Sequence, residues 1–234
     1  MEDTRMMRDA WLATITRLGA RGAGATLLLG PHAERLADQL PGPTASTTNG
    51  VAALGGGDVH DVAEPTATGV PDGSFDTAVA LSAWDSPADV GAVVDEAVRV
   101  TKSDGTVWLG EIDARALTRS MPAAQPYGLL YRYEPGVAEI VRHMFRAARG
   151  LGVEAVRTGL HGVSETRADL PAAVAGSPEG FVEAVRGGVW PGVSSLDAAA
   201  RDRLLGRVEE SCSRSERFPL VLTLPWTLVR GRRS

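Results

Sequence analysis

The chain has 234 residues, a length that suits one α/β domain or a domain with a modest insertion. Its formal net charge of -5 argues against a general affinity for nucleic acid, and its one cysteine, Cys212, excludes an internal disulfide and a multi-cysteine metal site. The charged start MEDTRMMRDA lacks the apolar core of a signal peptide, and no apolar run reaches the roughly 20 residues that cross a bilayer. We therefore expect a cytoplasmic protein with no membrane or nucleic-acid partner.

The first quarter of the chain predicts a helix, a strand and a second helix. Apolar residues recur at helical spacing over 7–18. The apolar run 25–29, bounded by glycines, predicts a buried parallel strand, and 31–40 predicts a helix with proline in its first turn. Residues 41–56 are rich in Pro, Thr, Ser and Gly, and we expect a weakly patterned second strand inside them.

The rest of the chain continues to alternate between strands and helices. A helix at 88–101 is predicted between strands at 77–81 and 107–110. After these come, in order, an irregular segment at 115–134, a helix at 135–151, a sixth strand at 153–158, two helical stretches within 177–210 and a last strand at 218–230. This alternation predicts an α/β fold: a Rossmann-like, mostly parallel sheet with helices on both faces.

The segment 57–113 contains a series of motifs in a fixed order. They are Asp58 in a glycine-rich run, PDGSFD at 71–76, the strand 77–81, an acidic helix ending in E-x-x-R-V at 96–100, a turn at 102–105 and the strand 106–110. This series resembles the middle of a class I S-adenosylmethionine (SAM)-dependent methyltransferase of the small-molecule, type 11 kind. We expect the PDGSFD motif to be structural, with Pro71–Gly73 forming a turn and Phe75 filling the core.

The C-terminal part resembles the same family. It carries a P-x-x-F-V-x-A-x-R-x-G stretch, a long helix and then a final strand with W-x-x-V-R. The resemblance implies the class I methyltransferase architecture in a single domain over 1–234. The segments 114–135 and 164–217 would then be available as a substrate cover.

The cofactor region departs from the family pattern. A nucleotide-type cofactor binds at the carboxyl ends of strands where the strand order reverses, and only glycine lets the backbone approach it closely at low cost. The family has an acidic residue and a G-x-G-x-G loop after the first strand, whereas this chain has LLLGPHAERL with Gly30 as its only glycine. The family also has an acid after the second strand, and residues 44–54 contain no Asp or Glu. SAM is the implied cofactor, and these departures predict weakened binding.

The resemblance places the contacts with the cofactor at Gly30, His32, Asp58, Val59, Leu81, Ser82 and Trp84. Asp58 would accept a hydrogen bond from the adenine amine, or would lie solvated in its loop. Trp84 would offer its ring face to a sulfonium, or would pack at the sheet edge. His32, or the backbone of 47–49, would substitute for the missing groups.

Four side chains are candidates for chemistry on the methyl acceptor: Glu111, Asp113, Tyr131 and His161. Glu111 and Asp113 end the predicted fifth strand and would serve as a general base or cap the next helix. Tyr131 lies among tyrosines and arginines, a composition that suits an aromatic or anionic ligand, a protein partner, or rings packed on the core. His161 is expected in a glycine-flanked loop, and the spacing of the histidines indicates no metal site.

Three functions remain open from the sequence. The first is SAM-dependent methyl transfer to a small molecule. The second is a pseudo-methyltransferase that has lost SAM binding and acts as a binding or scaffold subunit. The third is a non-methylating biosynthetic enzyme, such as a cyclase, on the same fold. The partner would be a small-molecule substrate or a protein, and both homo- and hetero-oligomers remain open.

Overall fold

The computed structural model describes residues 24–30, 44–48, 51–54, 65–82, 89–119, 133–145, 149–186, 192–214 and 218–234. The chain divides into two compact units. We call Trp11–Ile112, Ala147–Ala168 and Trp226–Ser234 the sheet unit, and Met1–Ala10, Asp113–Arg146 and Asp169–Pro225 the helical unit.

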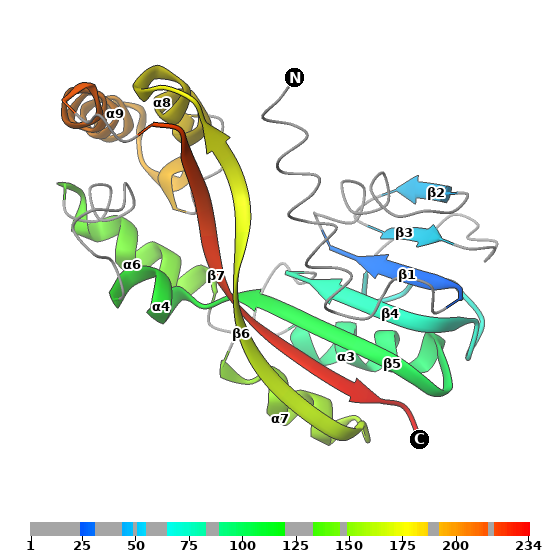
Figure 1. The fold of residues 1–234 in the computed structure, drawn as a ribbon. Helices are drawn as coiled ribbons and strands as arrows, with labels where there is room; N and C mark the ends of the chain where they lie inside the picture. Colours follow the sequence, from blue (N-terminus) through cyan, green and yellow to red (C-terminus); the bar gives the residue numbers. More distant parts are fainter. Residues whose placement is uncertain are drawn as a thin grey trace. The chain divides into compact units, whose positions relative to one another are not determined.

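The strands form one sheet in the order β2-β3-β1-β4-β5-β7-β6 (Figure 1). They are β1 (Thr26–Leu29), β2 (Thr44–Thr48), β3 (Val51–Leu54), β4 (Phe75–Leu81), β5 (Thr101–Ile112), β6 (His161–Ala175) and β7 (Leu220–Arg232). Residues 169–175 of β6 and 220–225 of β7 belong to the helical unit. The remaining residues of both strands belong to the sheet unit. The α/β class predicted from the sequence is confirmed.

The sheet contains more antiparallel pairing than the sequence pattern suggests. The pairs β1–β4 and β4–β5 are parallel, whereas β1–β3, β2–β3 and β5–β7 are antiparallel. The single strand expected within 41–56 is a hairpin, in which Thr48 pairs with Val51. The two residues between them are Asn49 and Gly50, the dipeptide that two-residue hairpin turns favour.

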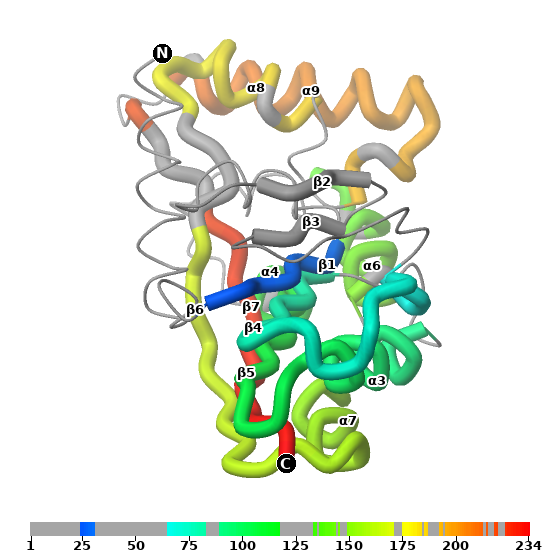
Figure 2. Tube along the Cα trace, turned by 90° about the vertical axis from the view of Figure 1, so that its right-hand side faces the viewer, coloured from blue at the N-terminus to red at the C-terminus, as the bar shows by residue number. Residues whose placement is uncertain are grey.

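Helices α3 (Val90–Val100) and α7 (Leu151–Arg157) pack on one face of the sheet unit (Figure 2). Every second residue of the central strands is apolar and points to this face. The resulting core includes Leu27, Leu29, Ala78, Ala80, Val107 and Leu109 from the strands, and Val93, Val94, Ala97, Leu151 and Ala155 from the helices. The helices predicted at 7–18 and 31–40 lie outside the described residues.

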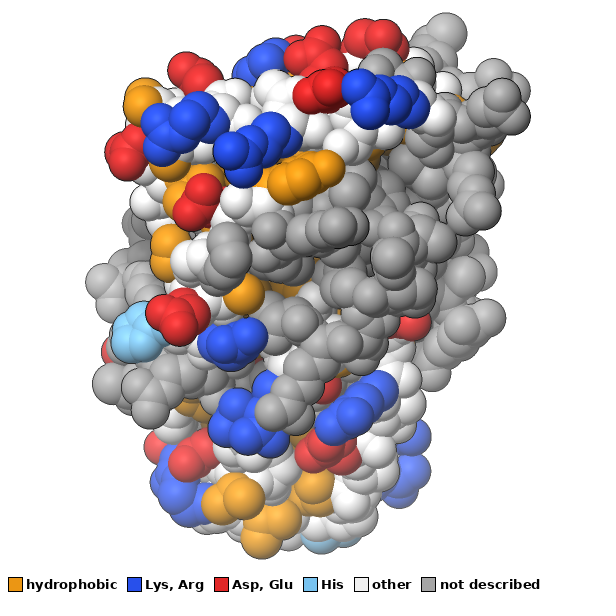
Figure 3. Space-filling model, turned by 90° about the vertical axis from the view of Figure 1, so that its left-hand side faces the viewer, with side chains coloured by type: hydrophobic (Ala, Val, Ile, Leu, Met, Phe, Trp, Pro, Cys, Tyr) orange, Lys and Arg blue, Asp and Glu red, His pale blue; other side chains and the backbone are white. Residues whose placement is uncertain are grey.

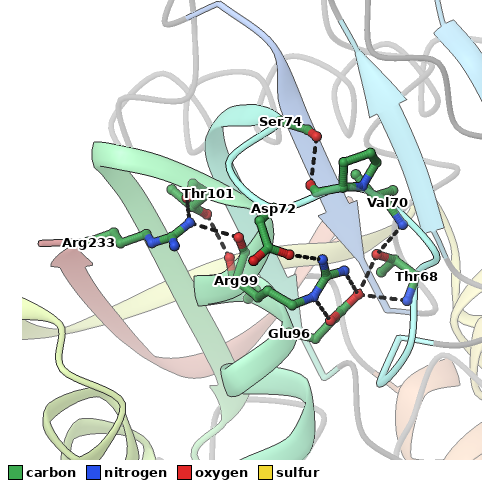
Figure 4. Close-up of polar contacts among 10 residues, drawn as sticks. Thr68, Val70, Asp72, Ser74, Glu96, Arg99, Thr101 and Arg233 are labelled. Carbon is green, nitrogen blue, oxygen red and sulfur yellow. Dashed lines mark hydrogen bonds and ion pairs between the residues drawn. The ribbon is translucent and has the colours of Figure 1, made fainter.

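The E-x-x-R-V motif joins α3 to the PDGSFD loop through a polar network (Figure 4). The buried carboxylate of Glu96 accepts hydrogen bonds from the Thr68 N–H (2.7 Å), the Thr68 hydroxyl (2.5 Å) and the Arg99 guanidinium (2.7 Å). Arg99 also forms an ion pair with Asp72 at 2.5 Å. At the C-terminus, Arg233 donates hydrogen bonds to the carbonyl oxygens of Arg99 and Thr101. The motif is therefore structural, as is PDGSFD, in which Phe75 is fully buried.

The helical unit is built mainly from helices: α4 (Ala114–Arg119), α6 (Pro135–Met144), α8 (Pro178–Arg186), η2 (Val193–Ser195) and α9 (Ala198–Ser213). Helix α8 packs on α9, and α4 packs on α6. The two helices predicted within 177–210 are confirmed. Burial raises the pKa of the Cys212 thiol in α9.

Two predicted elements are wrong. Residues 153–158, predicted as the sixth strand, belong largely to helix α7, and β6 starts only at His161. The valines suggested a strand, but Leu151 and Ala155 are four residues apart and both buried, the spacing of a helix. Part of the segment expected to be irregular, 115–134, is helix α4. The substrate cover at 114–135 and 164–217 stays a prediction.

Among the helices in the described parts of the chain, none combines the length and the apolar character needed to cross a bilayer.

Candidate site at the reversal of strand order

The order of the strands reverses between β1 and β4. After β1 the chain forms β2 and then β3 on one side of β1, and it then returns to form β4 on the other side. β1 and β4 are parallel with Leu29 beside Ala80, so their carboxyl ends lie next to each other. Ligands of open α/β sheets bind at such a point. The structure therefore brings together three predicted contact residues, Gly30, Leu81 and Ser82, in the sheet unit.

Gly30 and Ser82 both have positive φ at this edge, 112° and 46°. Only glycine adopts the first value at low cost, so a glycine is required at the end of β1. Ser82 is one of two described non-glycine residues with positive φ, and such strain costs on the order of 1–3 kcal/mol. Strained residues of this kind persist where the surrounding structure holds them, often at ligand sites.

Glu111 holds Ser82 in place. Its carboxyl group is buried, with 1% of the residue exposed. Its Oε1 atom accepts hydrogen bonds from the Ser82 hydroxyl at 2.7 Å and from the Ile112 N–H at 2.8 Å. The Ser82 N–H donates to the carbonyl oxygen of Gly110 at 2.8 Å. Sequence reasoning found Glu111 and Ser82 separately, but not the hydrogen bond between them.

The backbone around Gly110 keeps this edge tightly packed. A Cβ atom at Gly110 would lie 2.5 Å from Leu81 and 2.8 Å from Leu228. Leu81 is buried rather than open to a ligand, and its side chain lies close to Gly110 of β5. Within this cluster, Gly30 and Ser82 are the groups suited to approach a ligand.

The hairpin beside β1 supplies no acid where the family has one. β3 is antiparallel to β1 with Val51 beside Leu29, so β3 begins at the carboxyl edge of β1. The strands of this hairpin read TASTT and VAAL and contain no carboxylate. The acid that would bind the ribose hydroxyls is therefore missing from these two strands.

Asp113 lies in the helical unit and acts as a helix cap. Its Oδ1 atom accepts hydrogen bonds from the N–H groups of Arg115 and Ala116, both at 3.0 Å, in the first turn of α4. This is the capping alternative that the sequence left open. Asp113 is buried, which favours a structural role.

The remaining candidates lie elsewhere or outside the described residues. His161 begins β6 rather than lying in a loop, and its exposed ring has Nδ1 3.3 Å from the hydroxyl of Ser234. Five predicted site residues lie outside the described residues: His32, Asp58, Val59, Trp84 and Tyr131. Of the neighbouring tyrosines, Tyr133 is described, and its hydroxyl lies 2.6 Å from that of Ser211.

Where the chain is described, no group of three or more His, Cys, Asp or Glu side chains could hold a metal ion.

A comparison with protein-family models found no match, and a search of curated proteins found none. Solved structures gave matches at low identity. A putative methyltransferase from an antibiotic biosynthesis pathway of Anabaena variabilis is 16% identical, with 68% of this chain and 67% of that chain covered and a TM-score of 0.47. A putative methyltransferase from Bacillus halodurans is 13% identical, with 95% and 98% covered and a TM-score of 0.46.

The [4+2]-cyclase SpnF is also similar, at 16% identity, with 73% of this chain and 55% of that chain covered and a TM-score of 0.35. The first two neighbours carry methyltransferase names. The third neighbour is named as a cyclase, the kind of non-methylating enzyme that the sequence left open as a third function. With TM-scores below 0.5, these likenesses carry no argument about activity, which depends on the site itself.

Proposed function

We propose that the protein binds SAM at the carboxyl edge of β1 and β4 and transfers its methyl group to a small molecule. The observation that carries this proposal is the strained Ser82, held by the buried carboxyl group of Glu111 where the strand order reverses. Strain and buried ionisable groups cluster at ligand sites. The resemblance carried by the motif series at 57–113 supports SAM as that ligand.

The residues of this edge are suited to parts of such a ligand. Gly30 would let the first loop approach the methionine end closely. The Ser82 hydroxyl gives its only proton to Glu111, so its oxygen remains an acceptor for a donor such as an ammonium group. When bound, SAM would supply a methyl group on a positively charged sulfonium.

A second function is favoured by one observation. The hairpin strands TASTT and VAAL contain no carboxylate, although they flank the end of β1 where the ribose would lie. A lost hydrogen bond between charged and polar groups costs about 1.5–3 kcal/mol, or about 10- to 150-fold in affinity. The alternative is therefore a binding or scaffold subunit that has lost SAM.

Calorimetric titration of the purified protein with SAM and with S-adenosylhomocysteine separates these functions. Micromolar binding of either ligand supports the proposal, and conversion of labelled SAM in the presence of acceptor extracts would then test methyl transfer. Absence of heat and of thermal stabilisation at millimolar ligand would overturn it and leave the scaffold function. Binding without conversion by any acceptor would leave a non-methylating enzyme to be tested.

We expect Gly30→Ala to weaken SAM binding about tenfold, because a Cβ atom at φ 112° strains the loop and occupies the space of the ligand. Gly159→Ala is the matched control, since Gly159 also has positive φ, 85°, but has open space where its Cβ would lie and is far along the chain from the site. The same titration measures both variants. Equal affinities for the two would contradict a role of Gly30 in the site.

A further inference from the structure

The outermost described strand of the sheet, β6, presents a long exposed edge. The strand order ends at β6, whose neighbour is β7 (Figure 1). In the sheet-unit part of β6, residues 161–168, six of the eight residues are exposed and the other two are half-buried. Natural proteins usually protect such edges, because the outward N–H and C=O groups can pair with another strand. Residues 161–170 contain no proline or lysine, two common protections.

The charges on this strand are complementary to a second copy of itself. Glu165 and Arg167 flank Thr166, and all three are exposed. If two copies of β6 pair antiparallel with Thr166 opposite Thr166, each Glu165 lies opposite Arg167 of the other copy. Opposite charges in directly facing positions stabilise a strand pair, and like charges destabilise it. This register is therefore favoured over its neighbours.

An apolar surface lies beside the same point of β6. Val153 and Val156 of α7 are 70% and 61% exposed, the large hydrophobic residues found exposed among the described ones. Figure 3 shows apolar side chains at the lower end of its view, over α7. The Glu165 carboxylate oxygen Oε2 lies 3.5 Å from the position of a Cβ at Gly152, so α7 lies beside Glu165, next to the centre of the proposed pairing. On α7, Val156 follows Gly152 by four residues and shares its side of the helix.

We propose that two copies of the chain form a dimer through antiparallel pairing of their β6 strands about Thr166. A two-fold axis perpendicular to the sheet keeps α7 of both copies on the same face, where the exposed valines would meet across the axis. The interface would combine backbone pairing, two Glu165–Arg167 ion pairs and an apolar contact between helices. Two-fold symmetry closes such an assembly at two copies. This proposal does not depend on the proposed enzymatic function.

Charge reversal tests the proposal with the full-length protein in sedimentation velocity and light scattering over a dilution series. The wild type is expected to give twice the 24.5 kDa of the chain. Arg167→Glu and Glu165→Arg each place two like-charged pairs across the axis, and should weaken the dimer at least about tenfold. The double variant Glu165→Arg/Arg167→Glu restores both pairs and should return the affinity to within about threefold of wild type.

The control is Arg203→Glu, which makes the same charge change at an exposed position of α9 and should leave the dimer unchanged. A wild type that stays monomeric at about 100 µM would overturn the proposal, because a specific interface of this kind is expected to bind more tightly. So would a dimer insensitive to Arg167→Glu, or a double variant that remains as weak as the single variants.

Cross-linking checks the register independently of charge. Thr166→Cys would place the two introduced thiols opposite each other, and diamide should join them into a covalent dimer. Ser164→Cys is the control, because its two copies would be four residues apart along the strands, about 13 Å at roughly 3.3 Å per residue, too far for a disulfide. Cys212 is buried and should not compete. Equal cross-linking at both positions would contradict the register.

Discussion

Replacing Glu96 with alanine is expected to lower the free energy of unfolding by about 2–3 kcal/mol. Glu96 accepts hydrogen bonds from Thr68 and Arg99, and 8% of its side chain is exposed. Removing one partner of a buried ion pair costs about 3–5 kcal/mol. We expect the smaller loss of about 2–3 kcal/mol because 34% of the Arg99 side chain is exposed, so water can partly solvate its guanidinium when Glu96 is removed. Urea unfolding followed by circular dichroism measures the change.

The control is Glu154→Ala. Glu154 pairs with Arg157 at the same i,i+3 spacing in a helix of the same unit, but its side chain is 30% exposed, and among the described residues its hydrogen bond comes from the exposed Arg157 side chain. Glu154→Ala should therefore lower the free energy of unfolding by only a small fraction of the amount lost in Glu96→Ala. If the two variants lose equal stability, then the polar network of Figure 4 does not hold the PDGSFD loop in place.

The contribution of Glu96 should also depend on pH. Burial by itself would raise the pKa of Glu96, but hydrogen bonds from Arg99 and Thr68 outweigh burial and lower it from its ordinary 4.5. A lowered pKa in the folded state stabilises the protein above the ordinary value, and the stabilisation is lost as pH falls through the folded value. The difference in stability between wild type and Glu96→Ala should therefore shrink below about pH 4.5. A difference independent of pH would contradict the charged hydrogen-bond network.

The elements with strong local patterns were predictable from the sequence, and those that depend on distant contacts were not. The buried strands β1 and β4 and the helix α3 follow from apolar runs and helical spacing. The hairpin β2–β3 was missed, although Asn49-Gly50 is a strong hairpin signal, because the segment 41–56, rich in Pro, Thr, Ser and Gly, was interpreted as holding one weakly patterned strand. Helix α7 was missed because Val153 and Val156 have strand propensity and yet face outward from a helix.

The site shows the same division. The sequence predicted Gly30, Ser82 and Glu111 as candidates, because the resemblance placed them at strand ends. It could not predict that Ser82 adopts φ 46° or that Glu111 is buried beneath it, since both depend on how β4 and β5 pair in register, with Leu81 beside Gly110. In the same way, the partner of Glu96 is Thr68, which lies 28 residues upstream.

The hydrogen bond between Ser82 and Glu111 predicts a strongly non-additive pair of substitutions. We expect Ser82→Ala to weaken SAM binding by about 10- to 100-fold, the loss of one hydrogen bond to a charged ligand group. Glu111→Gln should weaken it by about tenfold or more, because its buried carboxyl group acts through Ser82 rather than on the ligand. In the Ser82→Ala background, Glu111→Gln should then add less than about threefold.

Calorimetric titration with SAM and S-adenosylhomocysteine measures all three variants without a known acceptor. Ser74→Ala is the matched control, since its hydroxyl donates at the same 2.7 Å, to the carbonyl oxygen of Pro71 in the PDGSFD loop. This control should keep wild-type affinity, and thermal unfolding confirms that each variant is folded. If Glu111→Gln leaves affinity unchanged but lowers methyl transfer, Glu111 is a general base instead, and burial under Ser82 does not prevent it from reaching the acceptor. Additive losses from the two substitutions would show that each residue meets the ligand independently, and the positioning role of Glu111 would fail.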